Sequence, residues 1–330
     1  MLEVALIIIF LALVFDFLNG FHDSANSIAT IVSTQVLTPR QAVLFAASFN
    51  FIAAFIFDVS VAKTIGEGLV RADQVDLTIL AAAILGAILW NLLTWYFGIP
   101  VSSSHALMGG YGGAAIAKLG FGCIIASGWT KVIIFMVAAP IIGFIIGLIN
   151  MFVMTWVVKN KKPKKVDKLF RRLQLISAGF YSFGHGTNDA QKTMGIIALV
   201  LYTGGFIDTF HIPYYVIILC YTSIALGTMF GGWRIIKTMG MKITKLRPIG
   251  GFCAEFAGAT TLLGTALFGI PVSTTQTITG AIVGVGSLKR LSAVRWGVAG
   301  RIVWAWIFTI PLSGLSGMGF YYLIKLFINN

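Results

Sequence analysis

The sequence predicts an all-α polytopic membrane protein made of two related halves, and three observations predict that class. Hydrophobic residues make up 58% of the chain and charged residues only 11%, unlike the balance of a soluble domain. Apolar runs recur along the whole chain, and two polar phrases each occur twice within them, in the same order. Such halves can be parallel or inverted. We expect an inverted two-fold internal repeat, because alternating access then follows from two similar half-structures.

The apolar runs define the expected membrane helices. They cover residues 4–14, 42–57, 77–97, 132–158, 196–202, 214–230, 252–268 and 298–327. A helix needs roughly 20 apolar residues to cross the hydrocarbon core, so several of these runs can span it. The shorter runs beside the polar phrases are typical of broken or re-entrant half-helices. The last run is long enough for two crossings, with breaks expected at Pro311, Gly314, Gly317 and Gly319.

Basic residues concentrate between the two halves. The net charge is +13, and much of it lies within residues 159–172. A short basic loop between hydrophobic spans faces the cytoplasm, so we expect no nucleic-acid partner and a lipid bilayer around the rest. The predicted parts are a first membrane repeat over 1–158, a basic cytoplasmic linker over 159–172 and a second membrane repeat over 173–330. A second basic stretch, 234–247, is also expected in the cytoplasm. These stretches set topology, or else bind anionic lipid or a regulator.

The first repeated phrase is Gly-Ile-Pro-Val followed by hydroxyl residues, at 98–105 and 269–276. Proline disfavours helix in the residue before it, so the preceding spans should end near Gly98 and Gly269. The hydroxyl residues then precede helix-compatible small residues. Hydroxyl N-caps, free amides and the positive dipole end of a helix together favour an anion. The candidate anion ligands are Ser103, Ser104, Thr274 and Thr275, unless these residues only cap re-entrant helices.

The second repeated phrase combines an aspartate with amides, at 19–28 and 185–194. Asp23 and Asp189 stand near Gly20 and Gly186, so we expect them in or beside broken segments. An unpaired carboxylate in hydrocarbon costs at least about 2.5–3.5 kcal/mol, which a bound hard cation would offset. Interior helix capping is the alternative. The candidate sodium ligands are Asp23, Asn26, Ser102, Asn188, Asp189 and Ser273.

With both phrases present in both halves, essentially the whole chain resembles the inorganic phosphate transporter (PiT) family, in its bacterial and archaeal form. The resemblance implies a cation-coupled phosphate symporter with an inverted-repeat helical fold of about twelve membrane segments. It implies a multi-pass protein of the cell membrane with no catalytic residues and no cofactor. A homodimer is expected by analogy only.

The residues also favour phosphate chemically. Monohydrogen phosphate keeps a proton that sulfate lacks, so an aspartate would accept its hydrogen bond and repel sulfate. We assign that acceptor to Asp23 or Asp189, with Asn26 and Asn188 between the anion and the cation. Lys192 completes the expected phosphate site.

The coupling ion is expected to be sodium, because the aspartate clusters are rich in neutral oxygen ligands. His22, His105 and His185 keep protons as an alternative. Lys192 occupies the position equivalent to Asn26, and Gln191-Lys192 resembles bacterial members, some of them proton-coupled. Lys192 could contact phosphate, neutralise Asp189 or replace a cation.

Three other polar residues are candidates for gating or coupling: Glu255, Gln276 and His105. Asp16 is a further intramembrane carboxylate and so a functional candidate. Rival functions are a metal-phosphate or sulfate permease, an anion channel, and a membrane enzyme acting on phosphate groups. The chain has no His-Glu-x-x-His, Gly-x-Ser-x-Gly or P-loop motif, which argues against the enzyme.

Overall fold

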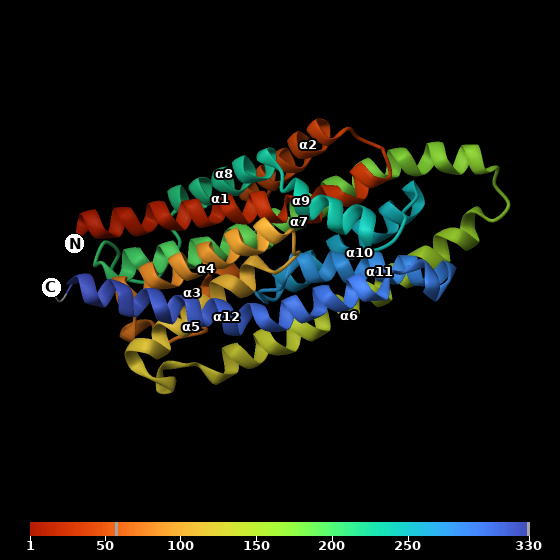
Figure 1. Ribbon diagram of the computed structural model, residues 1–330. Helices are drawn as coiled ribbons and strands as arrows, with labels where there is room; N and C mark the ends of the chain where they lie inside the picture. Colours follow the sequence, from red (N-terminus) through yellow and green to blue (C-terminus); the bar gives the residue numbers. More distant parts are fainter. Residues whose placement is uncertain (57–58, 329–330) are drawn as a thin grey trace.

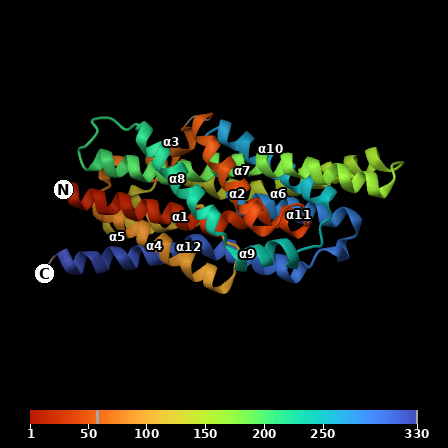
Figure 2. The ribbon, with the colours of Figure 1, turned by 90° about the horizontal axis from the view of Figure 1, so that it is seen from above.

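The computed structural model describes residues 1–56 and 59–328, and their fold is helical. The end of the expected run 42–57 and the last two residues of the expected second repeat lie outside the described residues. Among the described residues, the β-structure is an isolated bridge between Val70 and Ile124. The helices form an elongated bundle with both termini at one end (Figures 1 and 2).

The helices follow the same order in the two halves. The first half contains α1 (Leu2–Ser33), α2 (Pro39–Ile52), α3 (Ser60–Glu67), α4 (Leu77–Phe97), α5 (Ser103–Leu119) and α6 (Ala126–Val158). The second half contains α7 (Pro163–Thr203), α8 (Tyr214–Phe230), α9 (Trp233–Lys237), α10 (Pro248–Leu267), α11 (Thr274–Lys289) and α12 (Trp296–Ile328). The short helical turns are η1 (Ala53–Phe55), η2 (Ala72–Gln74), η3 (Phe121–Cys123), η4 (Thr238–Lys242) and η5 (Leu291–Ala293).

Four helices of the described chain, α1, α4, α6 and α12, are long and apolar enough to cross a membrane. Two bent pairs raise that number to six: α2–η1 with α3, at 83°, and α8 with α9–η4, at 61°. The bent pairs occupy matching places in the two halves, as broken spans should. The expected count of about twelve segments stays a prediction.

The expected break in the last apolar run is wrong, because α12 continues through Pro311 as one helix. Its glycines serve close packing instead. A Cβ added at Gly317 would meet the backbone of Gly110 in α5, and one at Gly113 would meet the backbone of Gly314. Small residues let membrane helices approach closely, so these positions join α12 to α5 and do not interrupt it.

The expected breaks beside Asp23 and Asp189 are also wrong, because both residues lie within the unbroken helices α1 and α7. The neighbouring glycines again permit close approach: a Cβ at Gly20 would meet the backbone of Ile224 in α8, and one at Gly186 that of Asn50 in α2. Helix α1 supplies side chains to the interior over most of its second half. The acidic phrases therefore lie on unbroken, tightly packed helices.

Helices α1 and α7 pack antiparallel. The Thr193 hydroxyl donates to Asp16 at 2.8 Å, and further along α1 the Thr34 hydroxyl donates to Gln174 at 2.9 Å. Residue numbers therefore rise along α1 while they fall along α7. In Figure 1, α1 runs away from the end that holds the termini and α7 runs back toward it.

The basic linker is largely helical. Helix α6 ends at Val158 and α7 begins at Pro163, so only residues 159–162 connect them, and 163–172 form the first turns of α7. Proline suits the first turn of a helix, where its missing N–H is not needed. This basic region projects at the end of the bundle opposite the termini (Figure 1).

Candidate functional site

Helices α4 and α10 end in the same way at the first repeated phrase. Gly98 and Gly269 adopt left-handed backbone conformations, with φ of +64° and +63°. The following amides, of Ile99 and Ile270, donate to the carbonyls of Thr94 and Thr265 at 2.9 and 3.0 Å. This is a Schellman-type ending, which favours glycine at the left-handed position. The prediction that the spans end near Gly98 and Gly269 is confirmed.

Two hydroxyl-capped helices begin just beyond these ends. Ser102 accepts the amide of His105 at 3.2 Å, and Ser273 accepts the amide of Gln276 at 3.2 Å. The predicted helix starts are confirmed, and the caps leave the first amides of α5 and α11 without helical partners. The role of Ser102 and Ser273 as sodium ligands stays a prediction, since the structure shows both hydroxyls as N-caps.

The start of α11 lies against α1. The Asn26 amide donates to the Thr275 hydroxyl at 2.9 Å and to the Thr274 hydroxyl at 3.3 Å. Thr275 in turn donates to Asp23 at 3.4 Å, and His22 Nδ1 lies 2.9 Å from the same carboxylate oxygen. The Asn26 Oδ1 atom is buried without a partner among the described residues. An unsatisfied buried acceptor of this kind invites a cation or a donor.

The Asp189 carboxylate is fully buried and has three close neighbours. Lys192 Nζ lies 2.5 Å from Oδ1, and the Thr274 hydroxyl donates to Oδ2 at 2.9 Å. His185 Nε2 lies 3.2 Å from the same Oδ2 atom. A carboxylate so deep in the protein requires compensation, and Lys192 supplies the opposite charge.

Lys192 is itself only 1% exposed, which is rare for a lysine. Besides Asp189, its ammonium group donates to the Ser104 hydroxyl at 2.5 Å and to the Val272 carbonyl at 2.8 Å. Three oxygen atoms thus surround one positive charge, as they would surround a small cation. The lysine also ties α7 to the starts of α5 and α11.

The residues around Asp23 and those around Asp189 form one cluster, which we call the central cluster. Ligand atoms of Asp23, His185 and Asp189 all lie within 4.8 Å of one another, close enough to hold one ion. The side chains of this cluster are buried, so the cluster is closed to solvent. Donors for an anion and acceptors for a cation therefore meet in one enclosed place.

Some predicted residues lie at the edge of this cluster. Both ends of the Asn188 amide bond to backbone, to the Leu262 carbonyl at 3.3 Å and the Val272 amide at 3.4 Å. The Ser103 hydroxyl is buried without a partner among the described residues. His105 and Gln276 lie 3.4 Å apart and link the two helix starts directly.

Glu255 lies in a separate buried cluster, nearer the linker end. Its carboxylate accepts hydrogen bonds from Thr30 at 2.6 Å, Gln174 at 2.9 Å and Ser177 at 2.5 Å. Thr30 stands seven residues after Asp23, on the same face of α1. This carboxylate therefore lies about two helical turns from the central cluster, and its gating or coupling role stays a prediction.

Sequence reasoning missed several supporting residues. Tyr181 donates to the Thr274 carbonyl at 3.1 Å, and Asn50 Oδ1 lies 3.2 Å from His185 Nδ1. The Gln191 side chain accepts the amides of Val61 and Ala62 at the start of α3. Asn50 was detectable as an isolated amide in an apolar run, whereas nothing in the local sequence distinguishes Tyr181.

Antiparallel membrane helices around a closed cluster of anion donors and buried carboxylates are typical of a membrane transporter. Residues 19–317 match the phosphate transporter family. The chain is 55% identical over 309 residues to a probable low-affinity inorganic phosphate transporter of Rhizobium meliloti, with 93% of this chain and 92% of the relative covered. A relative with the same description from Bacillus subtilis is 44% identical, covering 99% of this chain and 98% of the relative.

A solved structure described as the sodium-dependent phosphate transporter has the same fold. Its TM-score is 0.88 at 26% sequence identity, and the match covers 98% of this chain and 99% of that one. The chain belongs to the phosphate transporter family, which confirms the resemblance drawn from the repeated phrases. The relatives are transporters and not enzymes.

Proposed function

We propose that this protein is a secondary active symporter that imports inorganic phosphate with sodium ions by alternating access. The observation that carries the proposal is the closed cluster in which two hydroxyl-capped helix starts face two buried carboxylates. The antiparallel α1 and α7 are what an inverted repeat requires, and we include that repeat, about twelve membrane segments and a cell-membrane location in the proposal. A homodimer rests on analogy alone.

The phosphate site combines donors from both halves. The Ser104, Thr274 and Thr275 hydroxyls, with the free amides at the starts of α5 and α11, suit the bare oxygens of the anion. Lys192 and the Asn26 amide add further donors. We assign the acceptor of the phosphate hydrogen to Asp23, because Asp189 is already compensated by Lys192. The Asp23 carboxylate, which has no lysine beside it, disfavours sulfate because sulfate has no proton to donate to it.

The cation sites differ between the halves. In the second half Lys192 fills the position where a cation would neutralise Asp189, so we propose that it replaces one coupling ion. In the first half the smaller Asn26 leaves Asp23 without a fixed lysine, and its unpartnered Oδ1 offers a neutral ligand for sodium. The structurally similar sodium-dependent transporter supports that ion.

One observation favours proton coupling as a second candidate. His185, Asp189 and Lys192 are in mutual contact through the carboxylate, and such groups can exchange a proton. This candidate has the same phosphate site and differs only in the coupling ion, which would be a proton bound at Asp189 and its neighbours.

Radiolabelled phosphate uptake into proteoliposomes tests the proposal. An inward sodium gradient at equal pH should drive phosphate accumulation above equilibrium, whereas an inward proton gradient without sodium should not. Accumulation driven by protons alone would support the second candidate. Equilibration without accumulation under either gradient would identify a channel and contradict both forms of symport.

A further inference from the structure

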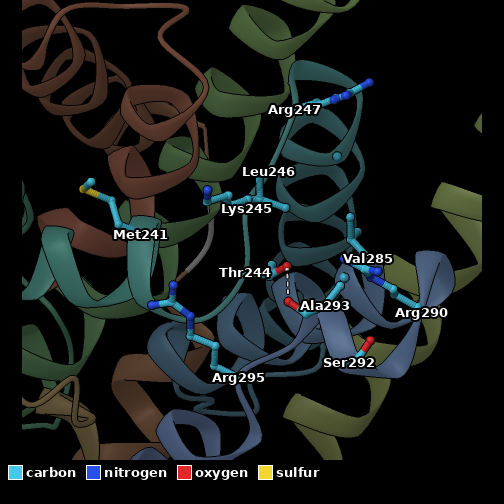
Figure 3. A pocket seen from close by; sticks show the side chains of 12 residues that line it. Met241, Thr244, Lys245, Leu246, Arg247, Val285, Arg290, Ser292, Ala293 and Arg295 are labelled. Atoms are coloured by element: carbon cyan, nitrogen blue, oxygen red, sulfur yellow. Dashed lines mark hydrogen bonds between the residues drawn. The ribbon is translucent and has the colours of Figure 1, made fainter.

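A basic pocket of about 320 Å³ lies far from the central cluster, between the loop that leads into α10 and the turn that follows α11. Figure 3 shows Lys245 and Arg295 on one side of Thr244, Arg290 on the other and Arg247 at the rim. Of the residues that the structure describes, no acidic residue lines this pocket. Its charges belong to two stretches, 234–247 and 289–301, that contain no Asp or Glu.

The walls of the basic pocket are held by hydrogen bonds. The Thr244 hydroxyl donates to the Ala293 carbonyl at 3.1 Å, and the Arg295 amide donates to the Ile243 carbonyl at 3.0 Å. Gly286 lies so close to Thr244 that an added Cβ would come within 3.1 Å of its hydroxyl oxygen. The two segments are therefore fastened together, and the hollow between them is preformed.

The four cations of the basic pocket lack counter-ions. Among the described residues, no ion pair and no side-chain hydrogen bond involves Lys245, Arg247, Arg290 or Arg295. Elsewhere in the chain, Arg171 is paired with Asp167 and Lys118 with Asp76. Four like charges around one hollow raise the local positive potential, which an anion would relieve.

The arginines indicate which anion. Guanidinium groups bind phosphate oxygens in pairs with good geometry, and three arginines around one pocket suit a phosphate group better than a point charge. The pocket also neighbours the linker, since Arg247 and Lys161 line an adjoining hollow of about 290 Å³. The bilayer surface on the expected cytoplasmic side is therefore within reach.

We propose that the basic pocket binds a phosphate group from the cytoplasmic side, carried either by an anionic lipid headgroup or by a soluble phosphorylated molecule. The pocket touches the start of α10 and the end of α11. The opposite end of α10 is followed by Gly269, and α11 begins with Thr274 of the transport site, so an occupant would bias how the two helices move. The site is distinct from the transport cluster and does not depend on its coupling ion.

Two probes distinguish the sources of the phosphate group: phosphatidic acid in otherwise neutral nanodiscs, and pyrophosphate added to nanodiscs of neutral lipid only. The full-length protein should bind at least one of them. The double variant Arg290→Gln with Arg295→Gln should weaken that binding at least about tenfold, through loss of two charge-assisted contacts. The matched control, Lys164→Gln with Lys165→Gln in the linker, removes the same charge and should bind like the unsubstituted protein.

The double variant Arg290→Lys with Arg295→Lys keeps both positive charges and should bind the probe with intermediate affinity. Unchanged thermal unfolding of each variant shows that a loss of binding does not come from misfolding. Binding of phosphatidic acid alone identifies a lipid headgroup as the source, and binding of pyrophosphate alone identifies a soluble one. Failure of both probes to bind would overturn the proposal. An equal loss of binding in the linker control would also overturn it, because the loss would then follow from the lower net positive charge and not from the pocket.

Discussion

At the scale of single residues, the position shared by Asn26 and Lys192 decides how the halves differ. The lysine lies among three oxygens of Asp189, Ser104 and Val272, whereas the asparagine only donates to hydroxyls and leaves its own oxygen unpartnered. One phrase thus places a lysine beside its aspartate, and the other places a neutral amide there. The two repeated phrases therefore differ in chemistry at this position.

Changing Lys192→Asn should therefore make phosphate uptake more dependent on sodium. Without the lysine, Asp189 loses its counter-charge, and leaving a buried charge unpaired costs about 3–5 kcal/mol unless a cation replaces it. The measurements are the steepness of sodium-dependent uptake and the gain in thermal stability with added sodium, both of which should rise. Lys118→Asn, at an exposed pair with Asp76, should change stability by less than about 1 kcal/mol. An unaltered sodium dependence in Lys192→Asn would rule out the cation-replacing role.

Asp23→Asn should relax selectivity against sulfate. The substitution removes the charge that repels a fully deprotonated anion and the acceptor for the phosphate hydrogen. Excess sulfate should leave uptake by the unsubstituted protein nearly unaffected and should inhibit the variant, whose phosphate uptake is also lower. The readout is the sulfate concentration that halves phosphate uptake. If sulfate competes equally in both proteins, Asp23 does not set selectivity.

At the scale of elements, glycines determine how closely the helices meet. Helix α5 packs against α12 and α11 against α6, so each hydroxyl-capped helix is held by the last helix of the other half. Gly113, Gly317 and Gly280 lie at these crossings, where an added Cβ would meet the backbone of the facing helix. The hydroxyl-capped helices α5 and α11 are thus held along their length by backbone contacts with α12 and α6.

Gly317→Ala should destabilise the protein by about 1–3 kcal/mol, because the added methyl group forces α12 away from Gly110. Gly319→Ala is the matched control two residues along the same helix, where a Cβ meets nothing within 4 Å. That control should be neutral or stabilising by up to about 1 kcal/mol, from helix propensity. Thermal unfolding in detergent compares the two, and equal melting temperatures would show that α12 tolerates the methyl group.

At the scale of the whole molecule, the distribution of charge along the bundle indicates how the protein is oriented in the membrane. The basic linker and the basic pocket lie at one end of the bundle and both termini at the other (Figure 1). From the positive-inside rule we expect the linker end to face the cytoplasm. Lys118 lies at the terminal end, since Tyr322 bonds to the neighbouring Ala117 carbonyl.

Cysteine labelling checks that orientation. The native Cys123, Cys220 and Cys253 are buried, so the unsubstituted protein should label weakly and serves as the control. A membrane-impermeant maleimide should label Lys118→Cys in intact cells and Lys165→Cys only in inside-out vesicles. The reverse pattern would place the linker outside and contradict the expected topology.

Much of the site was predictable because its signals are local. The caps at Ser102 and Ser273 and the helix ends at Gly98 and Gly269 depend on residues a few positions apart, and each occurs where the sequence indicates. The expected breaks at Gly20, Gly186 and Gly314 failed for a physical reason. Glycine either interrupts a helix or admits a neighbouring backbone, and the neighbour is not visible in the local sequence.

The sequence alone determined the membrane class, the doubled phrases and the residue types that suit phosphate and a cation, because composition and local backbone preference carry that information. Only the tertiary structure decided which residues share a cluster. Thr274 meets Asp189 across 85 positions within the second half, and Thr275 meets Asp23 of the first half across 252 positions, because helix packing brings these distant segments together. The same packing buried Lys192 beside Asp189 and left Asn26 Oδ1 without a partner in the described part of the chain, which no local pattern could specify.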